Sequence, residues 1–121
     1  MWFPSESKVR RSFEELIASH EQLDERMTRL QTILDQAKAE GVDDPALQDH
    51  MSDVQLRILK SKNELLKARL AIQFGAASWR GVVPLLTAMK TLVRSMEKHV
   101  AALEHGAADG QRRFERDFPS R

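Results

Sequence analysis

Apolar residues in the first forty positions recur at alternating steps of four and three. The repeat comprises Val9, Phe13, Leu16, His20, Leu23, Met27, Leu30, Leu34 and Ala37, and His20 is its one polar member. A heptad pattern kept over about four repeats predicts a long helix with a coiled-coil-like apolar seam. Ser5 or Ser7 is a suitable N-cap and Gly41 a suitable C-cap, so we expect this helix over about residues 5–40.

A second helix is predicted over about residues 45–74. Asp43 or Asp44 can cap its start, and Pro45 suits the first helical position. The same rhythm continues through Leu47, Met51, Val54, Ile58, Ser61, Leu65, Ala68 and Ile72, and a second apolar line comprises Leu59, Leu66 and Leu70, with Leu56 nearby. A helix with two apolar lines is expected to contact two neighbours.

A third helix is predicted over about residues 82–104. Its apolar line comprises Val82, Leu85, Met89, Leu92, Met96, His99 and Leu103. Gly106 is expected to end this helix, and residues 106–121 to form a flexible or loosely docked tail in which Phe114 and Phe118 can pack together. Short connections make neighbouring helices antiparallel. The sequence therefore predicts one all-α domain over residues 1–105, an antiparallel three-helix bundle with coiled-coil-like packing and a long first helix.

Unequal helix lengths lead to the first functional hypothesis. The third helix is predicted to reach the two-lined part of the second helix and to leave much of the first helix uncovered. An uncovered heptad seam is a binding site for another helix. We therefore expect a non-enzymatic interaction protein of the adaptor, assembly-factor, chaperone or inhibitor type. Its preferred assembly is a homodimer that pairs exposed parts of the first and second helices. The expected seam comprises Phe13, Leu16, His20, Leu23, Met27 and Leu30.

Charge is balanced overall but unevenly distributed. The 121 residues carry a formal net charge of +1, which gives no global field to attract nucleic acid or a membrane. Residues 1–44 hold 6 basic and 10 acidic side chains, a net of −4, whereas residues 45–75 hold 5 and 3, a net of +2. An acidic first helix and a basic second helix attract each other when they fold side by side.

Targeting and redox features are sparse. Cysteine is absent, which excludes disulfides and thiolate metal sites. No stretch approaches the roughly 18 apolar residues of a membrane span, and the opening "MWFPSES" lacks the features of a signal peptide. We expect a soluble, cytoplasmic protein, and export without a signal peptide stays open.

Catalytic and metal-binding motifs do not emerge from the sequence. There is no G-x-S-x-G motif or glycine-rich phosphate loop, and His20, His50, His99 and His105 form no H-x-x-x-H or Glu-x-x-His pattern. We therefore expect no enzymatic activity, cofactor or metal. His20 and His99 fall on apolar lines, where a histidine either sets the register of the helices or forms a pH-sensitive contact.

Basic residues supply an alternative function. Lys90, Arg94 and Lys98 follow one another at steps of four, and Arg57, Lys60 and Lys67 give the second helix a similar edge. These six side chains are candidate phosphate contacts in a nucleic-acid-binding helical protein. No aromatic residue is interleaved with them for base stacking. Attraction to the acidic first helix is the competing interpretation.

The connection "FGAASWRGVVP" supplies a further alternative. Its plain interpretation is a helix–helix turn in which Trp79 closes the end of the bundle. A Trp79-x-Gly81 turn between two amphipathic helices also resembles the WXG100 (ESAT-6-like) family, a similarity that covers roughly residues 45–105. It implies an exported helical hairpin that pairs with a second hairpin. The extra first helix, Pro84 after the turn and the absence of a tyrosine for the family's export signal depart from that pattern.

Overall fold

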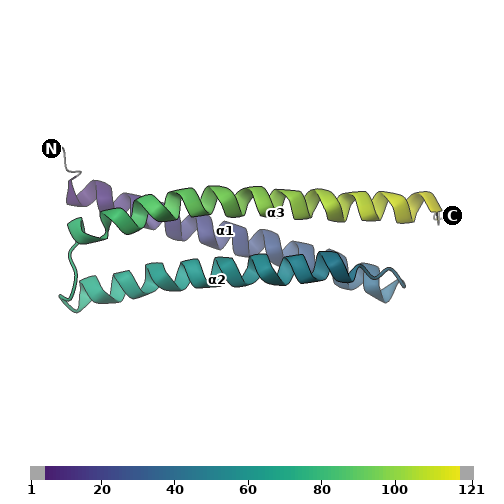
Figure 1. The fold of residues 1–121 in the computed structure, drawn as a ribbon, viewed down its shortest axis with the longest axis horizontal. Helices are drawn as coiled ribbons and strands as arrows, with labels where there is room; N and C mark the ends of the chain where they lie inside the picture. The colour runs from purple at the N-terminus through teal and green to yellow at the C-terminus, as the bar shows by residue number, and fades with distance from the viewer. Residues whose placement is uncertain (1–4, 118–121) are drawn as a thin grey trace.

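Three long helices lie side by side and run alternately up, down and up (Figure 1). The computed structural model describes the backbone of residues 5–117 and the side chains of residues 5–107. Its elements are α1 (Glu6–Ala39), α2 (Pro45–Gln73), a short 3₁₀ turn (Arg80–Val82) and α3 (Val83–Asp117). Every pair of helices is in contact. The predicted all-α, antiparallel three-helix bundle is confirmed.

The ends of α1 and α2 follow the predicted capping chemistry. Ser5 Oγ accepts a hydrogen bond from the Lys8 amide at 3.4 Å, and Asp44 Oδ1 accepts one from the Leu47 amide at 3.1 Å. Gly41 has a φ of 89°, a left-handed conformation that closes α1 without a side-chain clash. The sharp turn that follows sends α2 back along α1.

α3 extends well past its predicted end. The prediction that Gly106 terminates the helix near residue 104 is wrong, because α3 runs to Asp117. Gly106 packs close to Leu47 at the start of α2, and Ala107 is buried. This packing offsets the cost of glycine in a helix, about 1 kcal/mol relative to alanine. The proposed pairing of Phe114 with Phe118 lies outside the described side chains.

The longer α3 changes which surfaces are covered. It starts beside the first turns of α1 and runs along that helix (Figure 1). The six residues expected to form an uncovered seam on α1 are at most 5% exposed within the single chain. The prediction that this seam is left open is therefore wrong. Those residues, Phe13, Leu16, His20, Leu23, Met27 and Leu30, form the α1 side of the core.

An ion pair ties α1 to α3 just past the middle of both helices. The Arg26 guanidinium donates two hydrogen bonds to the Glu104 carboxylate, one of them from Nε at 3.2 Å. The hydrogen bond from Arg26 lowers the pKa of Glu104, and the same bond raises the pKa of Arg26. Both side chains keep partial contact with solvent, so the pair orients the helices more than it stabilises them.

None of the helices in the part of the chain that the structure describes is both long and apolar enough to cross a membrane.

Candidate partner-binding surface

The second apolar line of α2 faces outward. Its large apolar residues are 38–82% exposed, with Phe74 the most exposed of them. The prediction from the two-line pattern, that a neighbouring helix covers this line, is wrong within one chain. We define the α2 stripe as Leu56, Leu59, Asn63, Leu66, Leu70 and Phe74.

The α2 stripe lies opposite the core-facing side of the same helix. The core-facing line of α2 passes through the buried residues Met51, Val54, Ile58, Ser61 and Leu65. At 3.6 residues per turn, the centres of the two lines are separated by roughly 145° around the helix axis. α1 and α3 contact each other as well as α2, so both pack on the same side of α2. The stripe therefore points away from the rest of the chain.

Its spacing is that of a coiled-coil seam. When Leu56 takes heptad position a, Asn63 and Leu70 also fall at a, and Leu59 and Leu66 fall at d. Phe74 extends the stripe at the following e position. Asn63 is thus a polar residue at a central a position, the kind of residue that specifies the register between paired helices.

Basic side chains border the stripe on both flanks. Exposed Lys60 and Lys67 occupy the e positions on one flank, and Lys62 and Arg69 occupy the g positions on the other. Residues 54–74 contain five basic side chains and one acidic side chain, Glu64, which gives a net charge of +4. The surface around the stripe is therefore electropositive.

The two flanks differ in what they contact. On the g flank, Lys62 Nζ lies 3.3 Å from Asp24 Oδ2, and Arg69 donates a hydrogen bond to Glu14 at 2.6 Å. Acidic α1 thus already neutralises that flank. On the e flank, Lys67 lies 3.4 Å from Glu64 of its own helix, and within residues 5–107 Lys60 makes no ion pair. The e flank carries the less compensated charge.

The predicted phosphate contacts lie on two helices. Arg57, Lys60 and Lys67 are exposed on α2, and Lys90, Arg94 and Lys98 are exposed on α3. Within residues 5–107, none of these six bases forms an ion pair with a carboxylate of α1, so the interpretation that they face acidic α1 gains no support from the single chain. The α2 bases that reach α1 are Lys62 and Arg69, which were not among the six. The spacing of the basic residues does not point to Lys62 and Arg69, because these two residues lie between the two apolar lines of α2 and outside the edge formed by Arg57, Lys60 and Lys67.

Trp79 packs onto the first part of α1. Its ring lies 5.6 Å from that of Phe13, edge to face at 84°, and the Arg10 guanidinium lies 5.2 Å from the Trp79 ring. The Gly81 amide donates a hydrogen bond to Ser78 Oγ at 3.1 Å, which links the residues on either side of Trp79. These contacts agree with Trp79 closing the bundle end. The α2–α3 hairpin that carries the WXG100 resemblance packs on α1 of its own chain.

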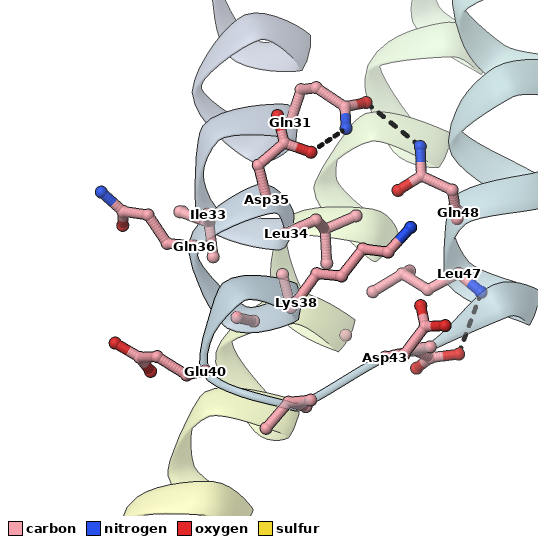
Figure 2. A pocket seen from close by; sticks show the side chains of 15 residues that line it. Gln31, Ile33, Leu34, Asp35, Gln36, Lys38, Glu40, Asp43, Leu47 and Gln48 are labelled. Atoms are coloured by element: carbon pink, nitrogen blue, oxygen red, sulfur yellow. Dashed lines mark hydrogen bonds between the residues drawn. The ribbon is translucent and has the colours of Figure 1, made fainter.

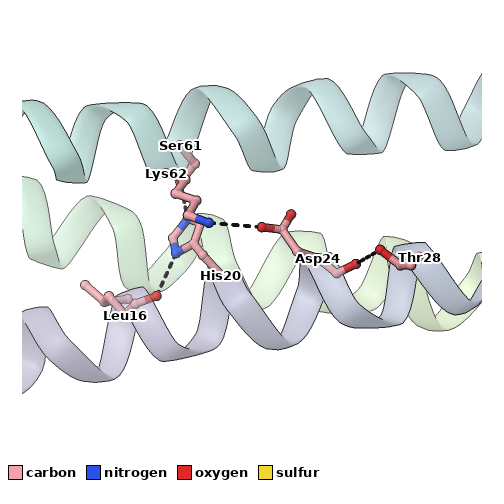
Figure 3. A network of polar contacts seen from close by, with 6 residues as sticks. All are labelled: Leu16, His20, Asp24, Thr28, Ser61 and Lys62. Atoms are coloured by element: carbon pink, nitrogen blue, oxygen red, sulfur yellow. Dashed lines mark hydrogen bonds and ion pairs between the residues drawn. The ribbon is translucent and has the colours of Figure 1, made fainter.

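A buried polar contact joins all three helices, and Figure 3 shows the part of it that lies between α1 and α2. The His20 ring, which is fully buried, has Nδ1 2.7 Å from the Leu16 carbonyl oxygen and Nε2 2.6 Å from Ser61 Oγ. Ser61 Oγ in turn lies 3.0 Å from Met89 Sδ on α3. A serine beside an imidazole is also found in nucleophilic catalysis, but both side chains here are sealed in the core. The contact therefore fits the interpretation in which His20 sets helix register.

His99 lies at the edge of the core rather than inside it. Its ring centroid is 6.0 Å from that of His50 on α2, with 68° between the ring planes. Within the described part of the chain, no group of three or more His, Cys, Asp or Glu side chains is placed to hold a metal ion.

A hollow of about 420 Å³ lies at the α1–α2 turn (Figure 2). Its polar side chains largely bond to one another. Gln31 donates to Asp35 at 2.8 Å and accepts from Gln48 at 3.2 Å, and Asp44 is engaged in capping α2. Few polar groups of the hollow are left to bind a ligand, so the α2 stripe is the stronger candidate surface.

Comparisons of the chain with protein families, curated proteins and solved structures found no match.

Proposed function

We propose that this protein is a non-enzymatic interaction module that binds a helix of another protein along the α2 stripe. The observation that carries the proposal is the row of exposed leucines at heptad spacing on the face of α2 opposite the core. Scattered exposed leucines are ordinary on a protein surface, whereas a row of them along one face is the pattern of a helix-binding seam.

The energetics of the stripe suit a reversible complex. Complete burial of a Leu or Phe side chain contributes about 1.5–3 kcal/mol, and the stripe residues are roughly half exposed. Covering them is therefore worth roughly 5 kcal/mol, and the apolar side of the partner adds a similar amount. The entropy lost on association takes back much of this gain. We therefore expect a complex of moderate affinity that forms and dissociates reversibly.

Binding to model helices tests the proposal. The probes are two fluorescein-labelled three-heptad peptides with Leu at a and d and Asn at the central a, one with Glu and one with Lys at e and g. Fluorescence polarisation should show binding of at least one peptide. The double variant Leu59→Gln/Leu66→Gln should bind that peptide about tenfold or more weakly.

Leu92→Gln is the matched control. Leu92 on α3 and Leu66 on the stripe are both 38% exposed, but Leu92 lies off the stripe. The control variant should bind as the unmodified protein does. If neither peptide binds, or if Leu92→Gln weakens binding as much as the stripe variant does, the proposed function is wrong.

Nucleic-acid binding is a second candidate, favoured by exposed Lys90, Arg94 and Lys98 at one-turn spacing on α3. Within residues 5–107 these three bases make no ion pair that would compete with phosphate. A labelled duplex should then bind at low salt and be released steeply as salt rises. Unchanged duplex binding after replacement of all three by Gln would exclude this surface.

A further inference from the structure

We infer that the occupant of the α2 stripe is an acidic amphipathic helix from another protein, rather than a second copy of this chain. The inference rests on the proposed function and adds the chemistry of the partner. Its basis is the charge that borders the stripe, since e and g residues decide which helices pair across a heptad seam.

The partner's flanks should carry carboxylates. Lys60 and Lys67 project from the e flank one heptad apart, so both meet the same edge of a helix laid on the stripe. Glu64, 3.4 Å from Lys67, offsets only part of this charge. A partner with Glu or Asp on that edge gains two ion pairs, whereas a basic partner meets like charge.

A second copy makes a poor occupant on the same grounds. In an antiparallel pair of stripes the two e flanks face each other, so lysines meet lysines across the seam. In a parallel pair an e flank faces a g flank, which places Lys67 of one copy opposite Lys62 of the other. Like charges at these positions oppose pairing. Asp24 and Glu14 offset only the g flank of their own chain, so the lysine repulsion is full in the antiparallel pair, and a parallel pair gains no ion pair across the seam.

Asn63 defines the middle of the partner helix. It lies between two leucine pairs, at an a position where a buried amide needs a hydrogen-bond partner. The fitting helix therefore carries a polar side chain at the matching a position and leucine-like residues on either side. This requirement fixes the register of the complex.

The acidic and basic peptides described above test the inference, and like charges on each peptide keep it from pairing with itself. We expect the acidic peptide to bind about fivefold more tightly at low salt, the effect of two exposed ion pairs. This preference should shrink toward equality in about 1 M salt. The variant Lys60→Glu/Lys67→Glu should reverse the preference toward the basic peptide, and light scattering should show monomers throughout a hundredfold dilution.

The outcomes separate this inference from the proposed function. Equal binding of the two peptides, or a preference for the basic one, would overturn the acidic partner while leaving helix binding in place. A stable dimer that Leu59→Gln/Leu66→Gln converts to monomer would show that a second copy occupies the stripe. Absence of binding by both peptides would refute the proposed function itself.

Discussion

The buried contact between His20 and Ser61 offers a quantitative test of the core. The Leu16 carbonyl can only accept a hydrogen bond, so the Nδ1 atom 2.7 Å away carries the ring proton. In the neutral ring Nε2 is then an acceptor, and the Ser61 hydroxyl donates to it at 2.6 Å. Ser61→Ala removes that donor from a fully buried nitrogen. The unmet acceptor should cost about 1–3 kcal/mol of unfolding free energy.

The second single variant and the double variant give the coupling between the two side chains. In His20→Leu the Ser61 hydroxyl can redirect its proton to Met89 Sδ, a weak acceptor 3.0 Å away, so we expect a loss of about 1 kcal/mol. The double variant His20→Leu/Ser61→Ala leaves no polar group unpaired at the site. It should be less destabilised than the sum of the singles by about 1–2 kcal/mol.

Urea unfolding followed by circular dichroism at 222 nm measures all four proteins of the cycle. Ser52→Ala is the matched control. Ser52 lies on the exposed side of α2, the helix that carries Ser61, and its hydroxyl donates to the Gln48 carbonyl one turn earlier. The control should change stability by less than about 0.5 kcal/mol. Additive losses in the cycle would refute the hydrogen-bond assignment.

Three further predictions follow from contacts elsewhere. Because Arg26 lowers the pKa of Glu104, the pair stabilises the fold above the carboxyl's ordinary pKa of 4.5 and loses its effect as acidification passes below the lowered value. Thermal unfolding of Glu104→Gln should therefore show a loss of a few tenths of a kcal/mol at neutral pH that vanishes in acid. Trp79→Ala should cost about 2 kcal/mol in urea unfolding, and Trp79→Phe much less, because a phenyl ring can still pack on Phe13. Asn63→Leu should bind an acidic peptide with Leu at its central a position more tightly than the unmodified protein does, as measured by fluorescence polarisation. Unchanged affinity would argue against a seam in which Asn63 faces the central a residue of the partner.

Local chemistry allowed the limits of α1 and α2 to be predicted within one or two residues. Ser5, Gly41, Asp44 and Pro45 are strong signals because each satisfies or terminates specific backbone groups. The end of α3 was missed for the opposite reason. Gly106 is a helix terminator only when nothing holds the chain beyond it, and the packing of α3 beside α2 is a tertiary effect that local sequence does not encode.

The sequence predicts the second apolar line of α2 but not its exposure, because the two-line pattern predicts that a neighbouring helix covers it. The spacing of apolar residues predicts both lines of α2, and the prediction of two neighbours assigns each line to a helix that packs on α2. The angle between them, roughly 145°, argues against that assignment. Two neighbours that also touch each other must sit on one side of α2, so a bundle of three helices can cover one such line only. A chain with three helices and two opposed lines on one of them is therefore expected to leave one line open. This expectation depends on the angle between the lines as well as on their number.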